Sequence, residues 1–282
     1  MKLIKKVIHV FWYRCLWVYG KLQRIESRFC VISSGRQKKS KEILLSLKNK
    51  YSGRRCFILG NGPSLSVKDL ELLKNEITFA SNRIFNIFPQ TTWRPTFYSI
   101  GDRTVAISDD VQSMLDSVTC EMKFFIREHY VQASYGKLTS AHCFLNDIGK
   151  MKKFENVPYF ATDLTKGVCM LGTVTFMLMQ LAVWMGFTEI YLLGCDNKYQ
   201  FEISKDGKIT ENKGVKSYFG NTQQKSGAYG RTWETNLVYE FAEQYSRTHS
   251  FRIYNATRGG YLEIFERKNL DDVLASNGDN ND

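Results

Sequence analysis

The stretch from Phe57 to Leu65, FILGNGPSL, passes from a run of apolar residues into a tight turn built on glycines. Ser66 and Asp69 follow with the spacing of a capping box, which predicts that a helix begins at Val67. A strand, a glycine turn and a helix in that order are typical of α/β proteins, where such turns lie at the carboxyl ends of strands. The turn lacks the lysine of a P-loop and does not complete the dinucleotide-binding spacing.

Outward from this turn, short apolar runs alternate with helical patterns from residue 54 onward. This alternation predicts an α/β domain with a largely parallel sheet. The expected strands are 56–59, 77–80, 96–100, 123–126, 189–193 and 252–255, and the expected helices are 67–74, 109–117, 168–185 and 233–247. Asp206-Gly207 within residues 201–217 is a type I′ hairpin signal and predicts an excursion above the sheet.

The positive charge of the chain is concentrated at its N-terminus. Residues 1–55 hold 15 lysines and arginines against two acidic residues, a net charge of +13, so the rest of the chain carries −2. A nucleic-acid-binding core is therefore not expected. We expect an N-terminal extension over residues 1–50, one catalytic domain over 51–270 and a polar tail over 271–282.

The segment Ile4–Leu22 mixes lysine and arginine with five aromatic rings. It is too charged for a membrane span of roughly 20 apolar residues, and its composition suits an amphipathic helix at an anionic membrane surface. The alternative is a helix packed on the domain itself. Ser33–Ser40 is expected to be a polar linker. Seven scattered cysteines and the lack of a secretory signal favour a cytoplasmic protein, attached through residues 1–30 to the inner face of the plasma membrane.

The glycine turn is the first candidate for a binding site. Gly60 and Gly62 permit positive φ and close approach of a ligand to the backbone, and Pro63 stiffens the turn. The amides that begin the next helix favour an anion. The alternative is a tight turn that binds nothing.

Polar residues at the other strand ends extend this site. Asn82 can serve a ribose, a phosphate or a base edge, or can cap a helix. Asp102 can accept from a sugar hydroxyl, act as a catalytic carboxylate or cap a helix, and Asp196 can act as a carboxylate or form an Asx turn. Thr165-Lys166-Gly167 precedes the apolar helix expected over 168–185, so its amides and its lysine favour an anion.

Sequence signatures of metal and triad chemistry are missing from the chain. It contains no H-E-x-x-H, no D-x-D and no G-x-S-x-G pattern, and its four histidines have no ligand-like spacing. We therefore predict a metal-independent site with no permanent cofactor.

Five segments, GNGPSL, ASNRIF, TFYSIGD, TKGVCMLGTVTFMLMQLAVWMGFTEIYLLGCDNKYQ and RIYNATRGGYLEIFER, carry a family resemblance. Over residues 54–267 the chain resembles bacterial capsule- and lipopolysaccharide-associated proteins of a superfamily that links the family 42 sialyltransferases with the 6-hydroxymethylpterin diphosphokinases and flagellin-modification proteins. The resemblance implies a single Rossmann-like domain. It also implies that Gly60-Asn61-Gly62-Pro63-Ser64, Asn82 and Thr165-Lys166-Gly167 hold the CMP part of a CMP-sugar donor.

The chain departs from the sialyltransferase pattern at the catalytic base. The family's general-base histidine would fall near Tyr229–Arg231, where there is none, so Asp102 or Asp196 would have to deprotonate the acceptor. We expect a glycosyltransferase of capsule or lipopolysaccharide biosynthesis that acts on a glycan or lipid-linked acceptor. The alternatives are a diphosphokinase that uses ATP with magnesium held by Asp102 and Asp196, and a non-catalytic scaffold of polysaccharide assembly.

Overall fold

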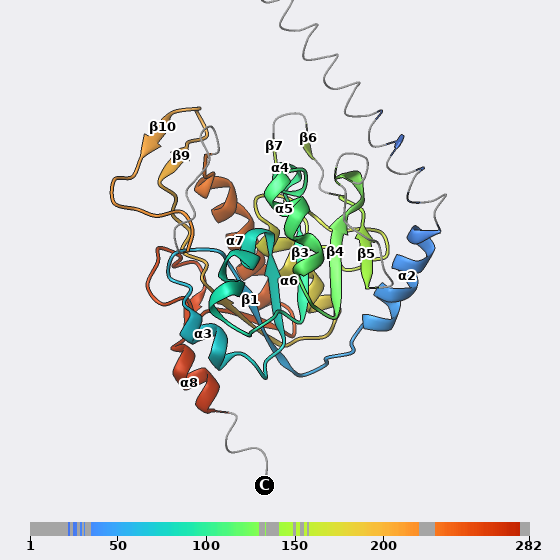
Figure 1. Ribbon diagram of the computed structural model, residues 1–282, viewed down its shortest axis with the longest axis horizontal. Helices are drawn as coiled ribbons and strands as arrows, with labels where there is room; N and C mark the ends of the chain where they lie inside the picture. The colour runs from blue at the N-terminus through green and yellow to red at the C-terminus, as the bar shows by residue number, and fades with distance from the viewer. Residues whose placement is uncertain are drawn as a thin grey trace, which may run out of the picture.

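The computed structural model describes residues 35–129, 133, 141–148, 151–152, 155–156, 158–219 and 229–276, and five single positions between 22 and 31 (Figure 1). Its centre is an eight-stranded sheet in the order β12-β11-β8-β1-β2-β3-β4-β5. Every pairing in this sheet is parallel, which confirms the predicted α/β, Rossmann-like fold.

All six expected strands are present, and the structure adds two at the edges of the sheet. The strands are β1 (Arg55–Leu59), β2 (Thr78–Ser81), β3 (Phe97–Ile100), β4 (Met122–Ile126), β5 (His142–Leu145), β8 (Glu189–Leu193), β11 (Arg252–Asn255) and β12 (Glu266–Arg267). The central strands are buried almost throughout. A parallel sheet that is covered on both faces needs such continuous apolar runs.

Helices cover both faces of the sheet, as Figure 1 shows. Cys56 and Ile58 of β1 pack in one cluster with α2 (Arg36–Leu47), α6 (Val174–Trp184) and α7 (Thr232–Arg247). Phe57 and Leu59 face the other way. Their cluster includes α3 (Val67–Leu72), the 3-10 helix η1 (Asn82–Gln90), α4 (Arg103–Ala106), α5 (Asp109–Met114), the 3-10 helix η2 (Leu115–Ser117) and α8 (Leu270–Ala275). The alternation along one strand therefore divides the core into two layers.

The long apolar helix begins six residues later than the expected start at Val168. Thr173 caps α6, and Val168 instead pairs with Asp147 beyond the end of β5. Gln180, in the second turn of the helix, accepts from the amide of Cys169 and donates to its carbonyl, at 3.0 and 2.9 Å. Because these bonds satisfy the backbone groups of Cys169 outside the helix and Gly172 has a φ of 72°, the helix cannot extend back to Val168.

The stretch expected to be a linker belongs in part to the globular body. From Arg36 onward it is helical, and Ser40 Oγ accepts from the amide of Phe144 in β5 at 2.8 Å. Further along α2, the carbonyl of Leu44 accepts from the indole of Trp184 at 2.7 Å. The predicted membrane helix, Ile4–Leu22, lies outside the described residues except for Leu22. None of the described helices is long and apolar enough to span a bilayer.

The predicted excursion is present as the antiparallel pair β9 (Phe201–Ile203) and β10 (Ile209–Glu211). Its turn differs from the expected type I′, which needs positive φ at both central residues. Gly207 has a φ of 86°, whereas Asp206 does not take positive φ. A second small pair, β6 (Met151–Lys152) and β7 (Glu155–Asn156), follows β5.

Candidate functional site

The ends of four neighbouring strands bring most of the predicted site residues to one edge of the sheet. Asp196 follows β8, the Gly60–Ser64 loop follows β1, Asn82 follows β2 and Asp102 follows β3. Adjacent strands lie about 4.8 Å apart, so the loop has Asp196 on one side and Asn82 on the other.

The glycines of the loop serve contact with the neighbouring strand. The amides of Gly60 and Gly62 donate to the carbonyls of Leu193 and Gly194, at 2.8 and 2.9 Å. A Cβ atom on Gly60 would lie 2.2 Å from the carbonyl oxygen of Gly194, and one on Gly62 would lie 1.9 Å from Oδ2 of Asp196. Neither glycine has a positive φ. The expected conformational reason was therefore wrong, and close packing of the ends of β1 and β8 explains both glycines.

Asp196 anchors the loop from the β8 side. Its Oδ2 accepts from the Ser64 hydroxyl at 2.7 Å and from the Ser64 amide at 3.3 Å. Burial raises the pKa of Asp196 above its ordinary value, and the two bonds from Ser64 oppose that shift. The carboxylate therefore holds the loop in place. A catalytic role for it stays a prediction.

Two asparagines leave buried acceptors at the β2 side of the loop. Asn61 donates from Nδ2 to the carbonyl of Ser81 at 3.0 Å, and the Asn82 carbonyl accepts from the Tyr98 hydroxyl at 2.6 Å. The Oδ1 atoms of Asn61 and Asn82 are both buried, and neither has a hydrogen-bond partner among the described residues. A buried acceptor without a donor is costly. A ligand that brings hydroxyl or amino groups to this edge would remove that cost.

The start of α3 differs from the anion site that the sequence predicted. The capping box is present, with the Asp69 amide donating to Ser66 Oγ and the Ser66 amide donating to Asp69 Oδ2. Arg258 in turn donates to Asp69 Oδ1 at 2.7 Å. Because the first turn already holds its own carboxylate, it is not free to receive a phosphate.

Thr165-Lys166-Gly167 lies away from the loop. A Cβ atom on Gly167 would be 2.5 Å from the carbonyl oxygen of Asn146, the residue that follows β5. β5 is four strands from β1, which places its end about 19 Å from the loop. The expectation that this turn begins a helix is wrong, because α6 starts at Val174. The chain then returns to the sheet edge, where the methyl group of Met170 packs on Gly101.

Asp102 begins α4. Its Oδ1 accepts from the amide and hydroxyl of Thr104, both at 2.6 Å, and from the amide of Val105 at 3.3 Å. The capping role left open by the sequence is therefore present. Its role toward a substrate stays a prediction.

His129 is a candidate that sequence reasoning missed. It ends the short 3-10 helix η3 (Arg127–His129), directly after β4, so it lies at the same sheet edge as Asp102. Its Nδ1 is buried without a hydrogen-bond partner among the described residues. Burial lowers the pKa of His129 to about 4, against the opposing effect of the Asp102 carboxylate, so the ring is neutral near pH 7. The signal in the sequence that could have identified His129 is its position shortly after the strand expected over residues 123–126.

A cavity of about 300 Å³ lies on the β8 side of the loop. Its walls are Pro63, Asp196, Lys198, Gly214, Val215, Lys216 and Tyr261. Lys198 pairs with Glu202 at 3.2 Å, with its ammonium 5.9 Å from the centre of the Tyr261 ring. The excursion is also tied to the loop, because the Phe219 amide donates to the Asn61 carbonyl at 3.0 Å. The cavity thus offers two lysines beside the loop, where a phosphate can be neutralised.

The two predicted carboxylates cannot share one magnesium ion. Three strand spacings separate the ends of β8 and β3, about 14 Å, whereas magnesium ligands lie about 2.1 Å from the metal. Within the described part of the chain, no three His, Cys, Asp or Glu side chains are grouped as metal ligands. The alternative of a diphosphokinase whose magnesium is held by Asp102 and Asp196 therefore does not fit this geometry with a single ion.

Comparison with solved structures finds transferases at low sequence identity. The MAf glycosyltransferase from Magnetospirillum magneticum AMB-1 is 13% identical over 84% of this chain, with a TM-score of 0.45, and the chain spans 39% of that protein's length. The sialyltransferase CstII from Campylobacter jejuni, in complex with CMP-3FNeuAc, is 16% identical over 77% of this chain and 87% of its own, with a TM-score of 0.43. No curated protein matches the chain.

A match to a protein-family model relates this chain to known proteins more firmly than the solved structures do. The model described as 6-hydroxymethylpterin diphosphokinase MptE-like matches residues 24–202, more than half of the chain. The match covers the loop, the strands β1 to β5 and β8, and the apolar helix α6. As the resemblance predicted, the chain belongs to the 6-hydroxymethylpterin diphosphokinase MptE-like family.

Proposed function

We propose that the protein is a glycosyltransferase that uses a nucleotide-sugar donor and binds the nucleoside of that donor at Asn61 and Asn82. The observation that carries this proposal is the pair of buried amide oxygens, after adjacent strands, that have no hydrogen-bond partner among the residues that the structure describes. Ribose hydroxyls and base amino groups are donors that satisfy such oxygens, whereas phosphate oxygens would be repelled. A CMP-sugar is the donor that the family resemblance favours.

The donor phosphate is proposed to lie on the other side of the loop. Lys198 and Lys216 line the cavity beside Pro63 and provide positive charge there. As the bond between the sugar and the phosphate oxygen breaks, negative charge grows on the leaving phosphate, and nearby cations stabilise it. In this arrangement the helix ends that the sequence suggested for phosphate binding are not needed.

The acceptor hydroxyl is proposed to lose its proton to Asp196, which lines the same cavity as the lysines proposed to hold the donor phosphate. Burial raises the pKa of Asp196, which strengthens it as a base. The acceptor oxygen forms a bond to the anomeric carbon while the sugar–phosphate bond breaks, and the proton goes to the Asp196 carboxylate. Asp102 and His129, at the ends of β3 and β4, would contact the acceptor farther from the bond that breaks. Asp196, which is bonded to Ser64, keeps the loop in register for the donor.

The biological setting is proposed from the charge pattern and the family resemblance. Residues 1–30, with their aromatic rings and lysines, would hold the protein at the inner face of the plasma membrane. A lipid-linked glycan of capsule or lipopolysaccharide assembly would be presented there as acceptor.

A thermal-shift screen with CMP-, UDP- and GDP-linked sugars tests the proposal. We expect a CMP-sugar to raise the melting temperature of the wild type and to raise that of Asn82→Gly far less. Glycine removes the amide and accepts the positive φ of 52° at this position without strain. Asn49→Gly is the matched control, since Asn49 has a φ of 55° and follows α2, away from the site. Failure of every nucleotide sugar to stabilise the wild type, with or without magnesium, would disprove it.

A diphosphokinase is the second candidate, and the description of the matching family favours it. It would bind ATP with magnesium, and carboxylates other than the pair Asp102 and Asp196 would have to hold the metal. ATP binding that disappears on addition of EDTA, together with indifference to nucleotide sugars, would select this function. A protein that binds no nucleotide at all would match the scaffold alternative.

A further inference from the structure

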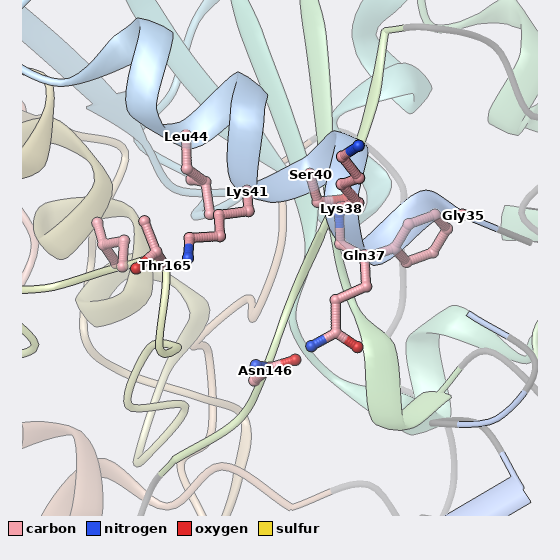
Figure 2. A pocket seen from close by; sticks show the side chains of 10 residues that line it. Gly35, Gln37, Lys38, Ser40, Lys41, Leu44, Asn146 and Thr165 are labelled. Carbon is pink, nitrogen blue, oxygen red and sulfur yellow. The ribbon is translucent and has the colours of Figure 1, made fainter. Parts of the chain in front are cut away.

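A second cavity, of about 410 Å³, lies between α2 and the end of β5 (Figure 2). It is far from the glycine loop, because that loop follows β1, four strands away from β5. Its walls are Gly35, Gln37, Lys38, Ser40, Lys41, Leu44, Phe144, Asn146, Leu164 and Thr165. The volume is within the usual range of small-ligand sites, roughly 300–1,000 Å³. The function proposed above does not use this cavity.

The wall formed by α2 is positively charged. Lys38 and Lys41 line the cavity together with Gly35, the residue that begins the helix. Within the described part of the chain no side chain caps this helix start, and its first turn contains no acidic residue to offset the positive end of the helix dipole. The wall therefore favours an anionic ligand.

An unsatisfied acceptor indicates a second chemical feature of the ligand. The Oε1 atom of Gln37 is buried and has no hydrogen-bond partner among the described residues. Figure 2 shows the Gln37 amide extending toward Asn146 across the cavity, while the Lys41 ammonium points toward Thr165. Because a carbonyl oxygen needs a donor, the ligand must bring a hydrogen-bond donor in addition to its negative charge, and a hydroxyl group is one that suits.

The floor of the cavity is apolar. Leu44, Phe144 and Leu164 are buried and provide a surface for C–H groups. At the opposite rim, the Asp163 carboxylate accepts a hydrogen bond from the Thr165 hydroxyl at 2.6 Å and forms an ion pair with Lys166 at 3.1 Å. The negative charge of Asp163 is therefore neutralised within the rim. An anion, hydroxyl groups and a C–H face are combined in a phosphorylated sugar or cyclitol.

We propose that this cavity binds a phosphorylated polyol ring, either free in solution or as the headgroup of a lipid. The phosphate lies between Lys38, Lys41 and the start of α2, and a ring hydroxyl donates to Gln37 Oε1. The lipid-borne source would place the cavity at the membrane, because the basic aromatic segment Ile4–Leu22 ends only 13 residues before Gly35 in sequence.

Calorimetric titration with glucose 1-phosphate tests the soluble source. We expect saturable binding that Lys41→Gln weakens roughly tenfold, the effect of losing one charge-assisted hydrogen bond. Gln37→Glu, which adds a negative charge, should weaken it further. Lys39→Gln makes the same charge change on an exposed residue of α2 that does not line the cavity, and should leave binding within about twofold of wild type.

Vesicle binding by the full chain tests the lipid source. Phosphatidylinositol and phosphatidylserine vesicles of equal charge separate polyol recognition from general attraction by the basic N-terminus. Stronger binding to phosphatidylinositol that is lost in Lys41→Gln and kept in Lys39→Gln supports the lipid-borne ligand. The proposal is overturned if neither probe binds saturably, or if Lys39→Gln and Lys41→Gln have equal effects. Asn82→Gly should not alter either result, so failure here is distinct from failure of the nucleotide site.

Discussion

At the scale of single residues, the glycines of the loop show how a correct prediction can rest on an incorrect reason. The sequence predicted a tight turn at Gly60 and Gly62, and the turn is there. The contact that requires glycine is with the end of β8, more than 130 residues later in the chain. The backbone angles expected at these glycines could not reveal this contact, because the sequence around the loop does not determine which strand lies next to β1.

Gly62→Ala should destabilise the protein by about 1–3 kcal/mol, the usual cost of overpacking a filled site. The added Cβ would lie 1.9 Å from Asp196 Oδ2 and 2.7 Å from the Gly194 carbonyl oxygen. Urea unfolding measures the change. A double-mutant cycle with Asp196→Ala tests the contact further. The double variant should lose less stability than the two single variants lose together, because alanine at position 196 relieves part of the clash with the new Cβ of residue 62. Strict additivity would contradict the proposed contact.

His129 should make stability depend on pH between about 4 and 6.5. Its folded pKa of about 4 lies below the ordinary value of 6.5, so the unfolded chain binds more protons in this window. The contribution of the neutral ring to the free energy of unfolding is therefore fully present above pH 6.5 and is lost as the pH falls toward 4. Unfolding free energies measured across this range should fall less steeply in His129→Gln than in wild type. Parallel curves would mean that His129 titrates normally.

At the scale of elements, the segment before α6 is where sequence patterns failed. The apolar residues from Val168 onward fit a buried helix, and the helix pattern continues to Met185. The structure keeps residues 168–173 out of the helix, and Gln180 bonds to both backbone groups of Cys169. A glutamine inside an apolar helix was the available signal, since a buried amide needs partners.

Gln180→Leu should therefore cost about 2–4 kcal/mol, because it leaves the Cys169 amide and carbonyl and the Ala161 amide without their partner. Thermal or urea unfolding measures the loss, and hydrogen exchange at Cys169 should become faster. Gln244→Leu, at an exposed position of α7, is the control and should change stability by less than about 0.5 kcal/mol. Equal effects of the two substitutions would contradict the role given to Gln180.

At the scale of the whole molecule, parallel strands explain both the successes and the failures of the sequence prediction. Once the strands were expected to be parallel, their polar ends had to lie at one edge, and Asp196, Asn82 and Asp102 do. The position of each strand within the sheet was beyond local patterns. The turn at Thr165–Gly167 was therefore expected beside the loop, although it lies near β5.

The arrangement of the sheet edge leads to one account of donor binding, with the nucleoside on the β2 side of the loop and the phosphate on the β8 side. Calorimetric titration of cytidine and of CMP into wild type, Asn82→Gly and Lys198→Gln, all in EDTA, tests it most directly. The account predicts that Asn82→Gly weakens both ligands by a similar factor, roughly fivefold for one lost hydrogen bond, while Lys198→Gln weakens CMP alone. Absence of CMP binding to the wild type, or unchanged affinities in Asn82→Gly, would contradict it.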